Sequence, residues 1–83
     1  MIKLLYFASL RETLGVSNES IELPGGVDSI GALRTHLASR GGAWEVFAAS
    51  KSLRAAVNQA MAGADARVAG GDEVAFFPPV TGG

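Results

Sequence analysis

The sequence predicts a small α+β domain in which one main helix packs across a mixed sheet. Apolar segments with strand-like alternation lie near both ends of the chain, and one segment of helical period lies between them. Glycine and proline pairs separate these elements. A chain of 83 residues has room for one domain only. The order strand, strand, helix, strands therefore favours a two-layer arrangement.

The first part of the chain is expected to form a strand, a helical turn and a second strand. Residues 2–7 (IKLLYF) alternate, so one face carries Ile2, Leu4 and Tyr6 and the other carries Lys3, Leu5 and Phe7. Residues 8–15 are expected to be helical and to end at a glycine. Residues 19–23 are expected to form the second strand, with two apolar side chains facing inward, Ile21 and Leu23.

The main helix is predicted to begin at a polar cap, Asp28 or Ser29. It then carries one apolar stripe with spacings of three and four residues, made of Ile30, Leu33 and Leu37. The Gly-Gly pair at 41–42 is expected to stop it. Residues 43–49 are expected to form a short second helix with two core anchors, Trp44 and Phe47.

The last part of the chain is expected to return to strands. Residues 53–59 are predicted as a strand, followed by a loop that contains Met61 and Gly63. Residues 67–68 are expected to be extended, and residues 70–72 to form a turn. Residues 73–77 are predicted as the final strand, with Val74 and Phe76 on one face and Ala75 and Phe77 on the other.

Composition excludes several classes of function. Seven basic and eight acidic residues give a net charge of −1 without a basic stripe, so neither nucleic acid nor a membrane is an expected partner. The absence of cysteine excludes disulfides and thiolate chemistry, and it suits a reducing cytoplasm. No apolar run is long enough to span a membrane, and the N-terminal residues are not expected to form a signal peptide. The single histidine, His36, lies off the apolar stripe, so neither a metal site nor a catalytic relay is predicted.

The C-terminal sequence PPVTGG predicts an extended tail over residues 78–83, beyond a domain of residues 1–77. Pro78 and Pro79 cannot continue a strand ladder and hold the chain extended. Gly82 and Gly83 have no side chains and so fit a channel too narrow for other residues. The reactive group would be the α-carboxylate of Gly83, which needs activation by a partner enzyme because this chain has no nucleotide-binding motif.

The predicted sheet also leaves apolar side chains on its second face. If one face of each strand packs on the helix, three residues face outward near the tail, namely Leu5, Phe7 and Phe77. Met61 is a candidate to join them. Large outward apolar groups beside a reactive tail favour a docking surface. The alternative is that a loop of this chain covers them or that the two faces are exchanged.

Three blocks of the sequence, YFASLRETLG, RAAVNQ and GDEVAFFPPVTGG, resemble the small subunits of molybdopterin synthase. The last block is the most specific, because it combines a turn, a strand, a proline break and a Gly-Gly end. The resemblance implies a ubiquitin-like β-grasp fold, with a mixed sheet on one main helix plus short helices. It also implies a sulfur carrier that is not catalytic alone.

The resemblance implies a role for each matching residue. A ubiquitin-activating-like adenylyltransferase would use ATP to adenylate Gly83, and sulfur would then replace AMP to give a 1-thioglycine thiocarboxylate. The tail, including Gly82, would enter the large catalytic subunit and deliver sulfur to cyclic pyranopterin monophosphate, within a heterotetramer that makes molybdenum cofactor. Contacts to the large subunit are implied for Phe7, Met61, Phe77, Pro78, Pro79, Val80 and Thr81. At Met61 the family commonly has another apolar residue. No bound cofactor is implied.

Three other functions stay open at this point. A sulfur carrier for thiamine thiazole synthesis would share the fold and the Gly-Gly end, but such carriers usually lack the YFASLRE-like start and the FFPPV approach to the tail. A ubiquitin-like protein modifier would form isopeptide bonds to lysines. A β-grasp binding module with an inert tail would be indifferent to removal of Gly83.

Overall fold

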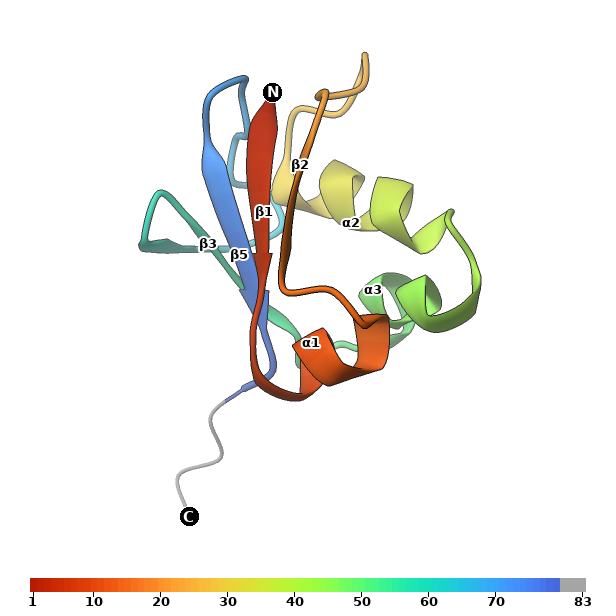
Figure 1. Ribbon diagram of the computed structural model, residues 1–83. Helices are drawn as coiled ribbons and strands as arrows, with labels where there is room; N and C mark the ends of the chain where they lie inside the picture. Colours follow the sequence, from red (N-terminus) through yellow and green to blue (C-terminus); the bar gives the residue numbers. More distant parts are fainter. Residues whose placement is uncertain (80–83) are drawn as a thin grey trace.

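A five-stranded mixed sheet forms one layer of the protein and short helices form the other (Figure 1). The computed structural model describes residues 1–79. Its strands are β1 (Ile2–Tyr6), β2 (Asn18–Ile21), β3 (Arg54–Val57), β4 (Ala60–Ala62) and β5 (Glu73–Phe77). Its helices are α1 (Ala8–Leu14), α2 (Ile30–Ala38) and α3 (Val46–Ala49), with a 3-10 turn, η1 (Gly42–Glu45), before α3. The α+β class is as predicted.

The sheet has the strand order β2-β1-β5-β3-β4. Its two central strands, β1 and β5, are parallel, whereas the other neighbouring strands are antiparallel. Parallel pairing needs a long crossover connection, and here the chain between β1 and β5 supplies it with α2. Because β1 and β5 run the same way, they end together, with Tyr6 opposite Phe76. The chain leaves both strands at the same end of the sheet (Figure 1).

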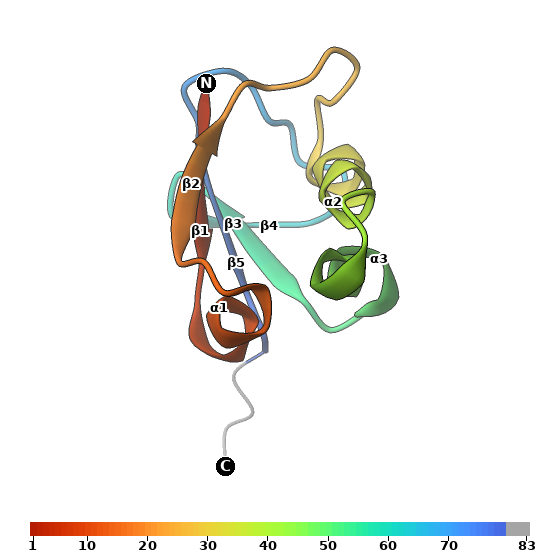
Figure 2. The ribbon, with the colours of Figure 1, turned by 45° about the vertical axis from the view of Figure 1, so that its right-hand side comes forward.

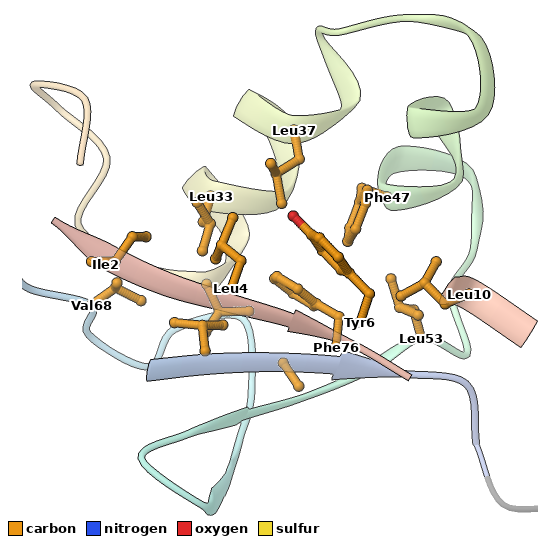
Figure 3. Packing of buried hydrophobic residues seen from close by; sticks show 13 residues of the cluster. Ile2, Leu4, Tyr6, Leu10, Leu33, Leu37, Phe47, Leu53, Val68 and Phe76 are labelled. Atoms are coloured by element: carbon orange, nitrogen blue, oxygen red, sulfur yellow. The ribbon is translucent and has the colours of Figure 1, made fainter. Parts of the chain in front are cut away.

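The hydrophobic core lies between the sheet and the helices. Figure 2 shows α2 and α3 together on one side of the sheet, with α1 at the end where the tail departs. The predicted inward faces are confirmed, because Ile2, Leu4, Tyr6, Val74 and Phe76 are all at most 1% exposed. From α2 and α3 they meet Leu33, Leu37 and Phe47, which are equally buried (Figure 3). Burying each such side chain contributes roughly 1.5–3 kcal/mol to stability.

The start of α2 is fixed by its cap and by a distant loop. Ser29 is the N-cap, and its hydroxyl accepts a hydrogen bond from the amide of Ala32 at 3.1 Å. The next two amides donate outside the helix, from Ile30 to the carbonyl of Ala66 and from Gly31 to that of Ala64, at 3.0 and 2.9 Å. The loop after β4 therefore satisfies amides that a helix start leaves free.

A cluster of three polar side chains, Tyr6, Glu19 and Arg40, lies near the C-terminal end of α2 and is called the polar clamp below. The buried hydroxyl of Tyr6 donates to Glu19 at 2.9 Å, and Arg40 forms a bidentate ion pair with the same carboxylate at 2.9 and 3.0 Å. The Arg40 guanidinium also lies 4.3 Å from the ring centre of Trp44. Arg40 holds the pKa of Glu19 below its ordinary value, whereas burial and then Glu19 raise the pKa of Tyr6. This clamp ties β1, β2 and the end of α2 together.

The strand predicted over residues 53–59 is wrong at its end. β3 stops at Val57, and Asn58 and Gln59 take positive φ values of 49° and 72°. A two-residue turn of this handedness is the tight connection of a β-hairpin, so the chain reverses and β4 follows. Met61 accordingly lies in a strand and not in the predicted loop. The sequence pair Asn-Gln is a weaker turn signal than Asn-Gly, which is why the hairpin escaped prediction.

Two smaller boundaries also differ from the prediction. β1 ends at Tyr6 and not at residue 7, because Phe7 is the extended N-cap of α1. β2 ends at Ile21 and not at residue 23, although Leu23 still packs against the core. Gly15 ends α1 as predicted, in the left-handed conformation with φ of 76°. Neither shift changes which face a side chain occupies.

Candidate docking face

The face of the sheet away from the helices carries a continuous apolar row. Register pairs place Leu5 beside Ala75, Ala75 beside Ala56, and Ala56 beside Met61. Neighbouring register partners share a face, so these four side chains cross β1, β5, β3 and β4 on the outer side. The centre of the row is made of two small alanines and its ends of larger side chains. None of the described helices covers this face (Figure 2).

Phe7 and Phe77 extend the row at the end where β1 and β5 leave the sheet. Phe7 is 46% exposed, and its amide donates to the carbonyl of Phe76 at 3.2 Å, which keeps it beside β5. Phe77 is half-buried and lies opposite Arg54 of β3. Pro78 and Pro79 follow directly and are half-buried. Parallel strands that end in register therefore bring two aromatic side chains to the root of the predicted tail.

Met61 completes the docking face at its far edge. Its side chain is 66% exposed, although it belongs to an ordered strand. We define the docking face as Leu5, Phe7, Ala56, Met61, Ala75 and Phe77. A mostly apolar surface of this kind, partly open to water, is typical of a protein interface.

The structure brings together the outward residues that the sequence singled out, namely Leu5, Phe7, Met61 and Phe77. Sequence reasoning missed Ala56 and its contribution to the face, because alanines that pair across strands look like a weak core strand until the register is known. Four residues of the predicted site, Val80, Thr81, Gly82 and Gly83, lie outside the described residues. The roles of these residues and of the tail boundary at residue 78 stay predictions.

The opposite end of the sheet holds the pair of carboxylates at Asp72 and Glu73. Asp72 accepts hydrogen bonds from the amide of Ala69 at 2.8 Å and from the side chain of Asn58 at 3.0 Å. The Ala69 amide and then Asn58 lower the pKa of Asp72. Asn58 in turn accepts from the amide of Glu73 at 3.0 Å. These contacts hold the β3–β4 turn against the start of β5, so the role of Asp72 in these contacts is structural.

Within residues 1–79, no group of three or more His, Cys, Asp or Glu side chains is arranged to hold a metal ion. None of the helices in this part of the chain combines the length and apolarity needed to cross a bilayer. His36 lies in the last turn of α2 and is half-buried. The docking face and the tail that follows it are therefore the best-supported functional region.

Comparison with known proteins gives matches over nearly the whole length of the chain. The ThiS family model matches residues 4–83. The "Molybdopterin synthase sulfur carrier subunit" of Escherichia coli (strain K12) is 43% identical over 83 residues, covering 100% of both chains. The protein of the same name from Haemophilus influenzae is 41% identical over 83 residues, again covering 100% of both.

Solved structures show the same fold. SAMP1 from Haloferax volcanii matches with a TM-score of 0.76 and 26% identity, covering 99% of this chain and 98% of that one. A chain of the protein-protein complex of subunit 1 and 2 of molybdopterin-converting factor from Helicobacter pylori matches with a TM-score of 0.65 and 20% identity. The match covers 99% of this chain and 97% of that one. The mixed sheet, its helix layer and these neighbours together identify a ubiquitin-like β-grasp fold. By its sequence over nearly its whole length, the chain belongs to the ThiS family.

Proposed function

We propose that this protein is the sulfur carrier subunit of a molybdopterin synthase. The observation that carries the proposal is the apolar docking face, one end of which lies at Phe77, directly before the residues of the predicted Gly-Gly tail. Full-length similarity to curated sulfur carrier subunits supports it. The docking face would bind the large catalytic subunit, and residues 78–83 would enter that subunit. The chain would supply the reactive sulfur and the docking surface, while its partner supplies acid and base groups.

The chemistry proceeds at the carboxylate of Gly83. An adenylyltransferase partner joins this carboxylate to the α-phosphate of ATP and releases pyrophosphate. A hydrosulfide equivalent from a sulfur donor then attacks the acyl carbon and displaces AMP, which leaves a thiocarboxylate. Its anionic sulfur attacks cyclic pyranopterin monophosphate inside the large subunit, and water restores the carboxylate. Two such rounds would supply the two sulfurs of the dithiolene, in a heterotetramer with one carrier at each end of a large-subunit dimer.

Two prolines at the start of the tail limit its direction, and its length limits its reach. Pro78 and Pro79 fix φ and cannot donate to a ladder, so they direct the chain away from β5. Six residues from Pro78 reach at most about 20 Å, so the reaction site can lie no further than this from the end of β5. A reducing cytoplasm suits this thiocarboxylate chemistry and the absence of cysteine.

Reconstitution tests the proposal. The chain is incubated with its adenylyltransferase, ATP and a sulfur donor, and its intact mass is measured. We expect a mass change equal to the exchange of one oxygen for sulfur, mapped to the C-terminal peptide. Addition of the large subunit and precursor should then return the original mass and yield the dithiolene product.

Two variants control that experiment. Deletion of Gly83, or extension beyond it, should abolish sulfur loading while the circular dichroism spectrum and melting temperature stay unchanged. Normal sulfur transfer from an extended chain would overturn the proposal. A thiamine-pathway carrier would load sulfur but fail to support dithiolene formation with the large subunit.

A second function has one structural observation in its favour. SAMP1 of Haloferax volcanii, whose name denotes a small archaeal modifier protein, shares the fold at a TM-score of 0.76. A modifier would be joined through Gly83 to lysine side chains of other proteins. Peptide mapping of native lysates for lysines that carry the C-terminal glycines distinguishes it from a carrier, which leaves no such adducts.

A further inference from the structure

The two edge strands of the sheet differ in chemistry. β2 carries the charged Glu19 and is followed by Glu22, and Glu19 is bound to Arg40. β4 and the two residues after it read Ala-Met-Ala-Gly-Ala over positions 60–64, with no charge and no proline. Natural edge strands commonly use charge, proline or a bulge to prevent pairing with another chain. The β4 edge has no charge and no proline and keeps an unbroken register with β3, so although it is only three residues long its main chain is open to an added strand at Met61.

The hairpin directs the backbone of Met61 toward this open edge. Val57 and Ala60 flank the two-residue turn and form its closing hydrogen-bonded pair. The next pair, Ala56 and Met61, is then a pair without hydrogen bonds between its members, since the two kinds alternate in an antiparallel ladder. The N–H and C=O of Met61 therefore point away from β3, where an incoming strand would meet them.

One hollow lies beside the β4 edge, and a second hollow adjoins the first. The first, of about 330 Å³, is lined by Met61, Ala62 and apolar side chains that include Ile30 and Leu53. The second, of about 450 Å³, lies over α2 and α3 and includes Phe47 in its lining. Both have Arg34 and Ala64 in their walls. The hollows give room for the side chains of a segment that pairs with β4.

The walls of these hollows are basic. Arg34, Lys51 and Arg54 line them, and no carboxylate does. Arg34 is held in place because its Nε donates to the carbonyl of Phe47 at 2.9 Å. Elsewhere in residues 1–79, Arg40 and Arg67 are paired with carboxylates. A chain with net charge −1 thus presents a local concentration of positive charge along one edge of its sheet.

We propose that the β4 edge is a second docking surface, which takes an extended acidic segment of a protein partner as an added strand. The main chain of that segment pairs with Met61, and its carboxylates lie toward Arg34, Lys51 and Arg54. Strand addition of this kind obtains affinity from main-chain hydrogen bonds and selectivity from side-chain pockets. The surface goes beyond the proposed sulfur carriage: it adjoins the docking face at Met61 and Arg54, but it uses the main chain of the β4 edge and does not involve the tail.

A synthetic peptide of alternating glutamate and valine, blocked at both ends, tests the proposal. It is titrated into the full-length chain labelled with ¹⁵N, at low salt because the attraction is screened by ions. We expect amide shifts concentrated at Met61–Gly63 and at the Arg34 side chain. A matched peptide with lysine in place of glutamate should cause none. Shifts absent from the β4 edge, or equal binding of the lysine peptide, would overturn the proposal.

Two substitutions at Met61 separate strand addition from side-chain contact. Met61→Ala removes the exposed side chain but keeps the N–H, whereas Met61→Pro also removes the N–H that faces the open edge. We expect Met61→Ala to retain peptide binding and Met61→Pro to lose it. Equal affinities for these two variants would contradict an added strand. The ¹⁵N spectrum of the free Met61→Pro chain checks that β3 and β4 still pair.

Charge reversal gives a test that does not depend on the proline variant. Lys51 and Arg54 are exposed, so Lys51→Glu with Arg54→Glu leaves the core untouched. The double variant should bind the glutamate peptide about tenfold more weakly or worse, because attraction becomes repulsion. Undiminished affinity would rule out the basic walls as the source of selectivity. As a control, Arg67→Glu reverses a charge away from the hollows and should leave peptide affinity unchanged.

Discussion

The two faces of the sheet are built from the same strands but differ in how much of their side chains is exposed to solvent. On the inner face Tyr6 and Phe76 are 1% and 0% exposed, and helices cover them. One residue further along each strand, Phe7 is 46% exposed and Phe77 is half-buried. The hydrophobic effect of folding explains the inner pair but gives no reason for apolar side chains on the outer face. The difference is the one expected if the outer face binds the large subunit, as we propose.

Substitution of adjacent phenylalanines gives the largest contrast between the faces. Phe76→Ala should lower the free energy of unfolding by roughly 3–5 kcal/mol, because it leaves a cavity among Tyr6, Phe47 and the sheet. Phe77→Ala should cost about 1 kcal/mol or less, since its side chain is already partly in water. Urea unfolding monitored by circular dichroism measures both. Equal losses would mean that the outer face also contributes to the core.

For binding to the large subunit, the substitution at Phe77 should have the larger effect, whereas for stability it is the substitution at Phe76. Phe77→Glu places a charge on the docking face beside the root of the tail and should weaken binding by about 2–4 kcal/mol, as for a buried aromatic anchor. Isothermal titration calorimetry with the purified large subunit gives the affinity. Lys3→Glu, on the outer face but at its far end, serves as the matched control. A Phe77→Glu chain that binds as tightly as the wild type would remove Phe77 from the interface.

The polar clamp at the edge of the inner face should make stability depend on acid. Arg40 lowers the folded-state pKa of Glu19 below 4.5, so the clamp stabilises fully above that value and its contribution is lost as the pH falls through the folded pKa. Glu19→Gln should lower stability by about 1–2 kcal/mol at neutral pH. It should also flatten the decline in melting temperature between neutral pH and about pH 3. An unchanged acid profile in the variant would assign the decline to other carboxylates.

The smallest expected effect concerns the helix layer alone. Ser29→Ala removes the side-chain cap of α2 and should cost about 1 kcal/mol of unfolding free energy. Affinity for the large subunit should not change, because Ser29 lies on the helix side of the sheet. Ser29→Asp should restore most of the stability, since a carboxylate also caps a helix start. A loss of affinity in Ser29→Ala would show that the two faces are coupled.

Prediction from the sequence succeeded where local chemistry decides. Alternation identified both faces of β1 and β5, and the spacing of Ile30, Leu33 and Leu37 identified the buried side of α2. The start of α2 was narrowed to Asp28 or Ser29, and Ser29 is the cap. Prediction failed where pairing between distant segments decides. The Asn58–Gln59 turn and β4 were missed because their stability comes partly from Asp72 and Glu73, which follow much later in the chain. The parallel register of β1 and β5, which brings Phe7 beside Phe77, is likewise invisible to a local pattern.

The central position of β5 has a consequence for the protein's synthesis. Without β5, the pair β1–β2 and the pair β3–β4 have no shared neighbour, so the sheet exists only as two separate hairpin-like halves. Translation makes β5 after every other strand, and the ribosome must therefore complete nearly the whole chain before the sheet can close. The strand that completes the fold is also the one that leads directly into the tail for which we propose the sulfur chemistry. A chain truncated before β5 therefore lacks both the closed sheet and the tail.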